Sequence, residues 1–446
     1  MKNVVVINSP LPDKQTEFSQ DDYLPPIGLG IIFSSIEKTH NVKFIDALAE
    51  NLDIDDISKQ LYLIKPDFIC TNIFTTNYLL VKKMVETLNM DTHWIIGGIS
   101  TKSLYPEIFK WNTNNMIDIV YGDGELIIKD IIEQKLQEQA NAKTLNCKFY
   151  TVDTKSKYYV SDISNEKLNR KIFNEPKTNY YNELEICIYT SRGCPYNCAF
   201  CVAARSRNAE LNKIRKKDKN AIINELKEIA KLYPNVTSIR ILDDLFLSKK
   251  EDFIDAAEIF NQFEFSWQAM CHIKSISNAT DELLTGIYQS GCKELFIGIE
   301  SGSPNILKKV QKTDDTSLIK KSIKRIITKG INVKGYFICG FPDETKDDLQ
   351  KTLDLATILT EYNKLCAARF RNSTFQFRPY YGTELCDEIT SKFGIPKENI
   401  LNKITISNVL NETVRNKSFN YDSGNYSSVS DDILVEYINK MNKLNE

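Results

Sequence analysis

Three cysteines lie within one short stretch of the chain, Thr190-Ser191-Arg192-Gly193-Cys194-Pro195-Tyr196-Asn197-Cys198-Ala199-Phe200-Cys201. Their spacing is C-x3-C-x2-C, and they follow the apolar run Ile186-Cys187-Ile188-Tyr189, which predicts a buried strand. A 4Fe–4S cluster is normally held by four thiolates, so three cysteines without an obvious fourth would leave one iron open to another ligand. Structural zinc is the alternative, but zinc favours four Cys or His ligands, and His40, His93 and His272 lie outside any such spacing. The stretch therefore predicts an iron–sulfur site with one reactive iron.

The bulk composition bounds the class of protein. A chain of 446 residues has room for two or three domains. The formal net charge of -2 carries no basic excess, so we expect no nucleic-acid partner. The N-terminus predicts a short buried strand rather than a signal peptide, and no apolar run reaches the roughly 20 residues of a membrane helix. We therefore expect a cytoplasmic protein without a membrane partner, whose other cysteines are reduced thiols.

Residues 1–125 alternate apolar strand-like runs with helical stretches, which predicts a doubly wound, Rossmann-like α/β domain. Ligands of such sheets bind beyond the carboxyl ends of the strands, and Gly97-Gly98 and Gly122–Glu125 fall at two of these ends. The predicted strands are Val4–Ile7, Val42–Ile45, Phe68–Ile73, Trp94–Ile96 and Ile117–Val120.

The rest of the chain divides into a connector, a barrel and a tail. In the connector, residues 126–184, we expect a helix over Leu126–Gln139 and a hairpin over Lys148–Val160. Residues 185–385 predict a partial (β/α)6 barrel, whose active site would lie at the carboxyl ends of its strands. The C-terminal extension, residues 386–446, is polar and predicts an amphipathic helix near Asp431–Leu444. The six predicted barrel strands are Glu185–Tyr189, Ser238–Leu242, Ser266–Cys271, Glu294–Ile299, Val333–Cys339 and Thr374–Arg378.

The cysteine stretch resembles the cluster motif of the radical S-adenosylmethionine (SAM) superfamily, in which the open iron binds SAM. The resemblance implies that Cys194, Cys198 and Cys201 hold a 4Fe–4S cluster. Four further stretches at predicted strand ends resemble the same barrel: Ile241–Phe246, Phe296–Ser303, Gly335–Thr345 and Phe375–Leu385. The SAM-binding residues that this resemblance implies are Phe200, Asp243, Asp244, Glu300, Ser301 and Gly340. The purely structural alternatives are a solvated acidic turn at Asp243-Asp244 and a helix cap at Ser301 or Ser303.

The N-terminal domain resembles the cobalamin-binding domain that precedes the barrel in one radical SAM subgroup. The cobalamin-binding residues that this implies are Pro26, Gly28, Gly30, Asp46, Thr71, Gly97, Gly98, Gly122, Gly124 and Glu125. The chain departs from the best-known cobalamin domains, because the region Asp46–Asn51 lacks their Asp-x-His-x-x-Gly element. Cobalamin would therefore be bound without a histidine ligand, or the domain would bind none. No Gly-x-Gly-x-x-Gly turn follows the first strand, which disfavours a dinucleotide.

The resemblance implies a cobalamin-dependent radical SAM methyltransferase. It would methylate an unactivated carbon of a metabolite or peptide through a 5′-deoxyadenosyl radical, with flavodoxin or ferredoxin as the external electron donor. A radical rearrangement or cyclisation without methyl transfer is the first alternative, and a non-enzymatic cobalamin or redox sensor is the second. Methylthio transfer to tRNA is disfavoured, because those relatives carry an N-terminal cysteine triad and residues 1–69 contain no cysteine.

Overall fold

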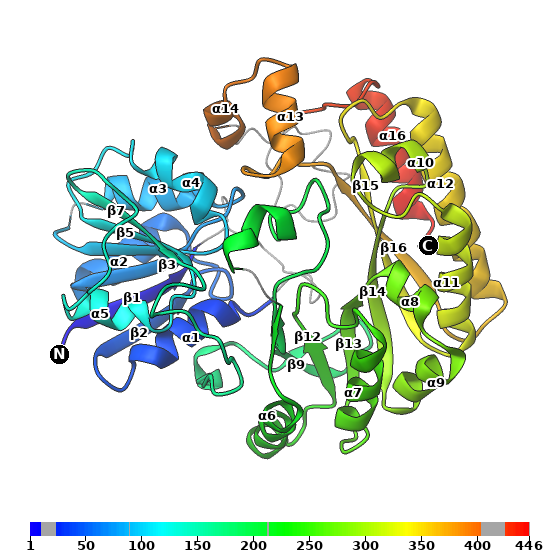
Figure 1. Ribbon diagram of the computed structural model, residues 1–446, viewed down its shortest axis with the longest axis horizontal. Coiled ribbons are helices and arrows are strands. Elements are labelled where there is room, and N and C mark those ends of the chain that lie inside the picture. Colours follow the sequence, from blue (N-terminus) through cyan, green and yellow to red (C-terminus); the bar gives the residue numbers. More distant parts are fainter. Residues whose placement is uncertain (10–23, 89, 212–213, 403–423, 446) are drawn as a thin grey trace. The chain divides into compact units, whose positions relative to one another are not determined.

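The computed structural model describes residues 1–9, 24–88, 90–211, 214–402 and 424–445, which form two compact units (Figure 1). The first unit comprises Met1–Glu175, Arg205–Lys213 and Tyr380–Ile404. The second unit comprises Pro176–Ala204, Ile214–Pro379 and Thr405–Glu446. Each unit carries its own seven-stranded sheet and its own hydrophobic core.

The sheet of the first unit has the strand order β2-β1-β3-β4-β5-β7-β6, and all neighbours are parallel except β6 and β7. From β1 the chain first adds β2 on one side and then returns to add β3 on the other side, so the strand order switches between β1 and β3. Open α/β sheets bind ligands at such a switch point. The strands are β1 (Asn3–Asn8), β2 (Asn41–Asp46), β3 (Phe68–Asn72), β4 (His93–Gly97), β5 (Ile117–Gly122), β6 (Ala142–Lys143) and β7 (Cys147–Val152).

Helices cover both faces of this sheet. In β1, Val4 and Val6 pack in the core with helices α1 and α5, whereas Val5 and Ile7 pack in the core with α2, α3 and α4. The predicted doubly wound, Rossmann-like architecture is therefore confirmed. The helices are α1 (Ile27–Ile36), α2 (Ile54–Ile64), α3 (Tyr78–Thr87), α4 (Thr101–Ile108), α5 (Ile127–Ile132), α13 (Glu384–Lys392) and α14 (Lys397–Asn402).

Two predictions for the connector were wrong in detail. Helix α5 ends seven residues before the predicted Gln139, and Gln134, two residues after its end, has a left-handed φ of 56°, which breaks the helical path. The predicted hairpin over Lys148–Val160 is displaced, because β7 runs parallel to β5 and forms its hairpin with the preceding β6. The turn after Asp153 exists but does not lead into a paired strand.

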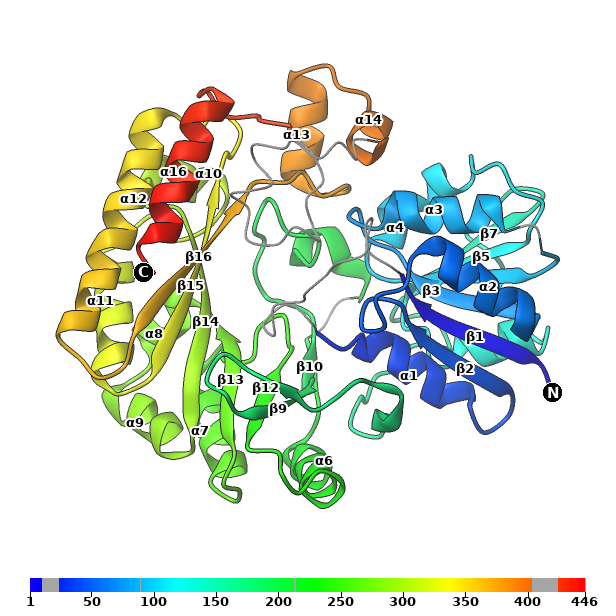
Figure 2. The same cartoon turned by 180° about the vertical axis from the view of Figure 1, so that it is seen from behind.

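The second unit contains six parallel strands in chain order, from β9 to β16, with the short β8 added antiparallel to β9 (Figure 2). This curled, open sheet confirms the predicted partial barrel. Only the last strand was misplaced: β16 begins four residues before the predicted Thr374 and ends at Gln376. Its first half was missed because Arg371, Asn372 and Ser373 are polar. The strands are β8 (Lys177–Thr178), β9 (Leu184–Ile188), β12 (Ser238–Ile241), β13 (Ser266–Cys271), β14 (Cys292–Glu300), β15 (Asn332–Cys339) and β16 (Phe370–Gln376).

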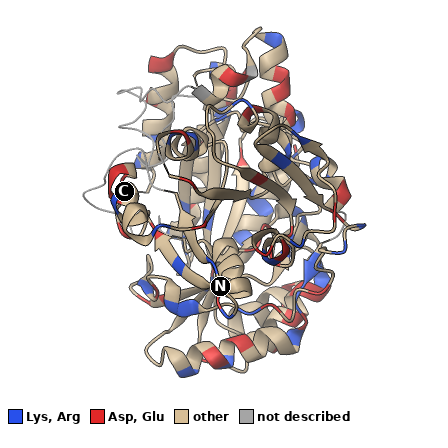
Figure 3. Ribbon diagram, turned by 90° about the vertical axis from the view of Figure 1, so that its left-hand side faces the viewer, with Lys and Arg blue, Asp and Glu red and all other residues tan. Residues whose placement is uncertain are grey.

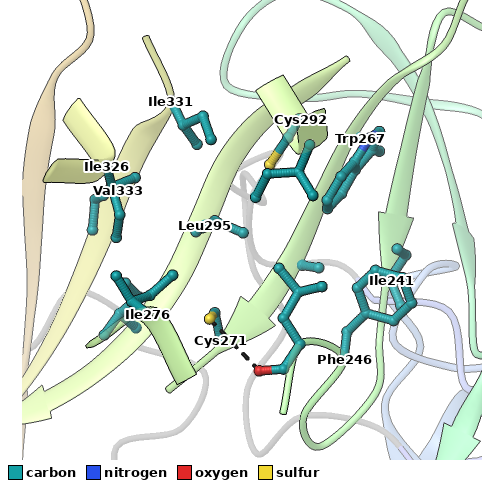
Figure 4. Close-up of a cluster of buried hydrophobic side chains, with 14 of the residues drawn as sticks. Ile241, Phe246, Trp267, Cys271, Ile276, Cys292, Leu295, Ile326, Ile331 and Val333 are labelled. Atoms are coloured by element: carbon teal, nitrogen blue, oxygen red, sulfur yellow. Dashed lines mark hydrogen bonds between the residues drawn. The ribbon is translucent and has the colours of Figure 1, made fainter. Parts of the chain in front are cut away.

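Helices cover one face of the curled sheet, and the core lies between the two (Figure 4). Strand residues such as Trp267, Leu295 and Val333 meet Ile276 and Ile326 of the helices in this layer. The predicted C-terminal helix is confirmed as α16, which packs on β16 and α12. The helices are α6 (Lys219–Leu232), α7 (Lys250–Phe260), α8 (Ile273–Asn278), α9 (Asp281–Gln289), α10 (Pro304–Lys309), α11 (Thr316–Thr328), α12 (Lys346–Glu361) and α16 (Asp431–Lys443).

Basic and acidic residues are interspersed along the ribbons in Figure 3, in keeping with the near-neutral net charge. Within the described part of the chain, every helix is too short or too polar to cross a bilayer.

Candidate active site

The cysteine loop begins where β9 ends, and a buried carboxylate fixes its first two residues. Asp243, at the end of the neighbouring β12, accepts four hydrogen bonds from Thr190 and Ser191. Its Oδ1 receives the two backbone N–H groups at 2.6 and 3.0 Å, and its Oδ2 receives the two hydroxyls at 2.6 and 2.7 Å. Burial raises the pKa of Asp243, and these four bonds oppose that rise. Asp243 therefore positions the cysteine loop.

The three cysteines lie close together on this loop and are partly exposed. The loop is tied down at Ala199, whose N–H donates to the carbonyl of Val310 at the end of α10 (3.2 Å). Burial raises the pKa of all three thiols, that of Cys201 to about 12, so a bound metal must displace their protons.

The three thiols do not fit a single metal ion. Across the described residues, no three His, Cys, Asp or Glu side chains are grouped tightly enough to share one ion. A four-iron cluster places each thiolate on a different iron, so it suits more widely separated ligands. This donor set fits the cluster reading better than the zinc alternative.

The predicted Glu300 belongs to a buried ion pair beside the cysteines, whose other member, Lys312, was missed from the sequence. Lys312 Nζ lies 3.0 Å from Glu300 Oε1, and both side chains are almost fully buried. Burial lowers the pKa of Lys312, but Glu300 and the nearby Cys198 and Cys201 outweigh this and raise it overall. Lys312 is therefore a cation placed among groups that become anionic when a metal binds.

The backbone at Glu300 is strained. Glu300 has φ 68°, in the left-handed region, at the point where the pairing of β14 with β15 shifts register. A side chain on Gly298 would collide with Glu300 Oε1, because an added Cβ would lie within 2.3 Å of it. Strain of this kind concentrates at functional sites.

Tyr196 and His272 form a second unpredicted element of the site. Their rings stack with centroids 4.0 Å apart, and His272 Nδ1 accepts the N–H of Lys274 (3.1 Å) as α8 begins. Burial lowers the pKa of His272 to about 3, and the charges of Lys312 and Lys274 act in the same direction. His272 is thus neutral at physiological pH and braces the cysteine loop through Tyr196.

The two members of the predicted acidic pair have different surroundings. Asp244 is exposed, whereas Asp243 is buried and fully hydrogen-bonded. Surrounding protein raises the pKa of Asp244, and the charge of Asp243 adds to this, while the N–H of Gly193 opposes it. Only Asp244 has a side chain open to a ligand.

Ser301 and Gly340 are held by internal contacts. Ser301 is fully buried and shares a hydrogen bond with Thr352 of α12 (2.9 Å), so its hydroxyl packs β14 against that helix. The N–H groups of Gly340 and Phe341 both donate to Glu344 Oε2, at 2.5 and 3.2 Å. Burial raises the pKa of Glu344 to about 8. Phe200 lies near Phe341, with ring centroids 5.8 Å apart.

The carboxyl edge of the first unit's sheet carries the predicted cobalamin residues, but several have local roles. Asp46 Oδ1 accepts from Asn8 Nδ2 (2.8 Å), and Thr71 donates to the carbonyl of Ile7 (3.0 Å). Both side chains link neighbouring strands. Gly28 and Gly30, both predicted to bind cobalamin, lie inside the first turns of α1, which begins at Ile27.

The glycines at this edge divide into packed and open positions. Three glycines are packed. A Cβ added to Gly30 would collide with Phe173, a Cβ added to Gly122 would collide with the carbonyl of Val152, and a Cβ added to Gly124 would collide with Ile32. Gly28 has no described atom within 4 Å of an added Cβ, and Gly97 has only Val120 O at 4.0 Å.

Asn72, at the end of β3, was missed from the sequence. Its buried Oδ1 has no hydrogen-bond partner among the described residues. Two open glycines and an unsatisfied amide oxygen along this edge of the sheet suit a large flat ligand with polar substituents.

Comparison with known proteins identifies the second unit's fold family. Residues 188–356 match the model of the radical SAM superfamily. The chain is 27% identical over 389 residues to an uncharacterized methyltransferase of Pyrococcus horikoshii, covering 81% of this chain and 77% of the relative. It is 24% identical over 335 residues to the anaerobic magnesium-protoporphyrin IX monomethyl ester cyclase of Rubrivivax gelatinosus, covering 71% of this chain and 58% of the cyclase.

Two solved enzymes share the fold across most of the chain. The cobalamin-dependent SAM radical enzyme OxsB, with aqua-cobalamin and SAM bound, superposes with a TM-score of 0.58 at 19% identity. That match covers 80% of this chain but only 52% of OxsB, so the chain spans about half of that protein. The radical SAM methyltransferase TsrM from Kitasatospora setae, with cobalamin and a [4Fe-4S] cluster bound, superposes with a TM-score of 0.59 at 14% identity. This match covers 88% of this chain and 78% of TsrM.

The family match begins at the end of β9 and includes the cysteine loop, Asp243, Glu300 and Lys312. The superfamily's shared chemistry requires a 4Fe–4S cluster and SAM. The chain thus contains a region, residues 188–356, that is similar to the radical SAM superfamily, and in this chain a Rossmann-like sheet precedes the half-barrel.

Proposed function

We propose that this chain is a cobalamin-dependent radical SAM methyltransferase that methylates an unactivated carbon of a small molecule or peptide. The observation that carries the proposal is the cysteine loop, anchored by Asp243 at the carboxyl edge of the half-barrel. The methyltransferase names of the Pyrococcus horikoshii relative and of TsrM, and the cobalamin in two structures of the same fold, support it. We assign cobalamin to residues 1–125, the radical chemistry to residues 185–385, and electron delivery to a flavodoxin or ferredoxin.

When bound, the cluster supplies an electron, SAM supplies both a hydrogen-abstracting radical and a methyl group, and cobalamin carries that methyl group. In the proposal, Cys194, Cys198 and Cys201 hold three irons. Lys312 offsets the negative charge of the thiolates, and Asp244 receives the SAM ammonium group by a charge-assisted hydrogen bond.

The products of SAM separate this proposal from its alternatives. Reconstituted protein should be incubated anaerobically with dithionite, SAM and cobalamin, and its nucleosides measured by mass spectrometry. The proposal expects 5′-deoxyadenosine together with S-adenosylhomocysteine. Formation of 5′-deoxyadenosine alone, without retained cobalamin, would favour a rearrangement or cyclisation, for which the cyclase relative is the supporting observation. Absence of both nucleosides would contradict an enzymatic role.

Bulk at Gly97 should block cobalamin. Gly97→Val adds bulk at the end of β4, where an added Cβ would meet nothing closer than Val120 O at 4.0 Å. We expect cobalamin affinity to fall about tenfold or more, as overpacking by a few methyl groups costs roughly 1–3 kcal/mol. Retained cobalamin is measured by its visible absorption after gel filtration.

Gly97→Ala is the matched control and should retain cobalamin. Gly98→Val is a poorer probe, because Gly98 has φ 109° and any side chain there is strained. Equal retention by Gly97→Val and wild type would place cobalamin elsewhere. His40 directly precedes β2, and His93 is the first residue of β4. Both therefore lie at the amino edge of the sheet, so neither imidazole is placed to ligate cobalt at the carboxyl edge.

A further inference from the structure

A buried cation, Lys312, lies beside the cysteine loop. The turn after α10 places it there, because Gln311 has φ 60° and the Lys312 N–H donates to Leu307 O at 2.9 Å. The same end of α10 holds the loop, since Val310 O accepts the N–H of Ala199 at 3.2 Å. The backbone of Lys312 therefore follows, by two residues, the point at which the helix is joined to the cysteine loop.

The ammonium group of Lys312 is fixed at the end of β14. Its Nζ lies 3.0 Å from Glu300 Oε1 and 3.4 Å from the carbonyl oxygen of Gly298. The side chains of the pair are only 10% and 7% exposed, so water and salt screen their charges weakly. A Cβ added to Gly298 would lie 3.0 Å from Nζ, so the ammonium packs directly against the backbone of the strand.

The charge of Lys312 acts on several groups of the loop. Burial raises the pKa of Cys194 and of Cys198, and the charge of Lys312 opposes the rise at both thiols. Burial also raises the pKa of Tyr196, and Lys312 opposes that rise too. Glu300 acts in the other direction at Cys198. The cation of the pair is therefore close to the whole stretch from Cys194 to Cys198.

Two further charged side chains near the loop are exposed. Besides burial, which has the largest effect, Lys274 lowers and Asp244 raises the pKa of thiols in the loop. Both side chains are open to solvent, which screens their charges. The two cations and two carboxylates cancel in number, so burial decides which of them has the strongest field. That field belongs to the buried pair, Lys312 and Glu300.

A fixed charge at this place has a consequence for reduction of a cluster. The potential of a 4Fe–4S cluster depends on net charge, on hydrogen bonds to its sulfurs and on solvent exposure. Reduction adds one negative charge, which a nearby cation stabilises and a nearby anion destabilises. Because Lys312 is buried, its effect persists at ionic strengths that remove the effect of an exposed cation.

We propose that Lys312 raises the reduction potential of the cluster that Cys194, Cys198 and Cys201 would hold, and that Glu300 limits this effect as its counter-ion. Lys312 makes and breaks no bond. One electron leaves an external donor, a flavodoxin or ferredoxin, and the iron site accepts it more readily because the ammonium group is there. The inference rests on the proposed function, since it assigns a role toward the same cluster.

The test is a redox titration of full-length protein, reconstituted anaerobically and kept without SAM, followed by electron paramagnetic resonance. We expect Lys312→Met to lower the ratio of reduced to oxidised cluster at a fixed potential about tenfold or more, a shift of about 59 mV for a one-electron couple. Lys312→Arg keeps the charge and should titrate near the wild type. Glu300→Gln removes the counter-ion and should titrate at a higher potential than the wild type.

Lys274→Gln is the matched control, because Lys274 is also a cation near Cys198 but is exposed. The substitution keeps the backbone N–H that His272 accepts, and the ratio should stay within about twofold of wild type. Lys312→Met leaves Glu300 buried without its counter-ion, which is destabilising. If that variant fails to fold or to hold iron, the double variant Lys312→Met/Glu300→Gln decides, and it should titrate below Glu300→Gln.

Three results would overturn the inference. They are an unchanged potential in a folded Lys312→Met variant, a fall in Lys312→Arg as large as in Lys312→Met, and equal potentials in Glu300→Gln and the double variant. Iron and sulfide analysis precedes each titration and separates this inference from the proposed function. A wild-type protein without a cluster would overturn both, whereas a wild-type cluster with any of these three results would overturn the role of Lys312 alone.

Discussion

Replacing Cys194, Cys198 and Cys201 together by Ala is expected to abolish the cluster and all SAM cleavage. In the proposed site each thiolate would hold a different iron, and the nearby His272 is stacked on Tyr196 with its Nδ1 already accepting a hydrogen bond. Iron and sulfide should fall from about four of each per chain to less than about one after anaerobic reconstitution. 5′-Deoxyadenosine should fall to the level of a protein-free control.

Cys366→Ala is the matched control, because Cys366 is another partly exposed thiol of the second unit. The Cys366→Ala variant should keep the full iron content and the wild-type rate of 5′-deoxyadenosine formation. The triple variant should still fold, since the loop is anchored at Thr190, Ser191 and Ala199 rather than through its thiols. A full cluster in a folded triple variant would show that other residues hold the iron.

The fold was largely predictable because periodicity records which side of a strand is buried. Apolar runs such as Val4–Ile7 are buried on both faces and stand out in the sequence. β16 did not stand out, because its inner residues Arg371 and Ser373 face the polar interior of the half-barrel. The β6–β7 hairpin was missed because β6 is only two residues long.

The site was only partly predictable, because sequence motifs mark strand ends but not the residues that fold back onto them. Lys312 follows Glu300 by twelve residues and returns through a tight turn after α10, where Gln311 has φ 60° and the Lys312 N–H donates to Leu307 O. No spacing rule encodes that turn. The motif also paired Asp243 with Asp244, yet burial and the four bonds from the loop separate their roles.

Asp243→Ala is expected to reduce both cluster retention and the stability of the protein. Removing the carboxylate would leave the N–H groups of Thr190 and Ser191 buried without acceptors, at roughly 1–3 kcal/mol for each group. The loop would then lose its anchor. We expect cluster retention to fall severalfold in iron analysis and the melting temperature to drop.

Asp243→Asn is the informative counterpart. Its Oδ1 can still accept both backbone N–H groups, and its Nδ2 can donate to the hydroxyls of Thr190 and Ser191, which then rotate to act as acceptors. We therefore expect Asp243→Asn to keep the cluster and SAM affinity. Asp244→Asn should also keep the cluster but weaken SAM binding about tenfold, because it removes the exposed charge. If Asp243→Asn weakened SAM binding and Asp244→Asn did not, the SAM contact would belong to Asp243; if neither did, Glu300 would be the next carboxylate to test, since it lies beside Lys312 at the same edge.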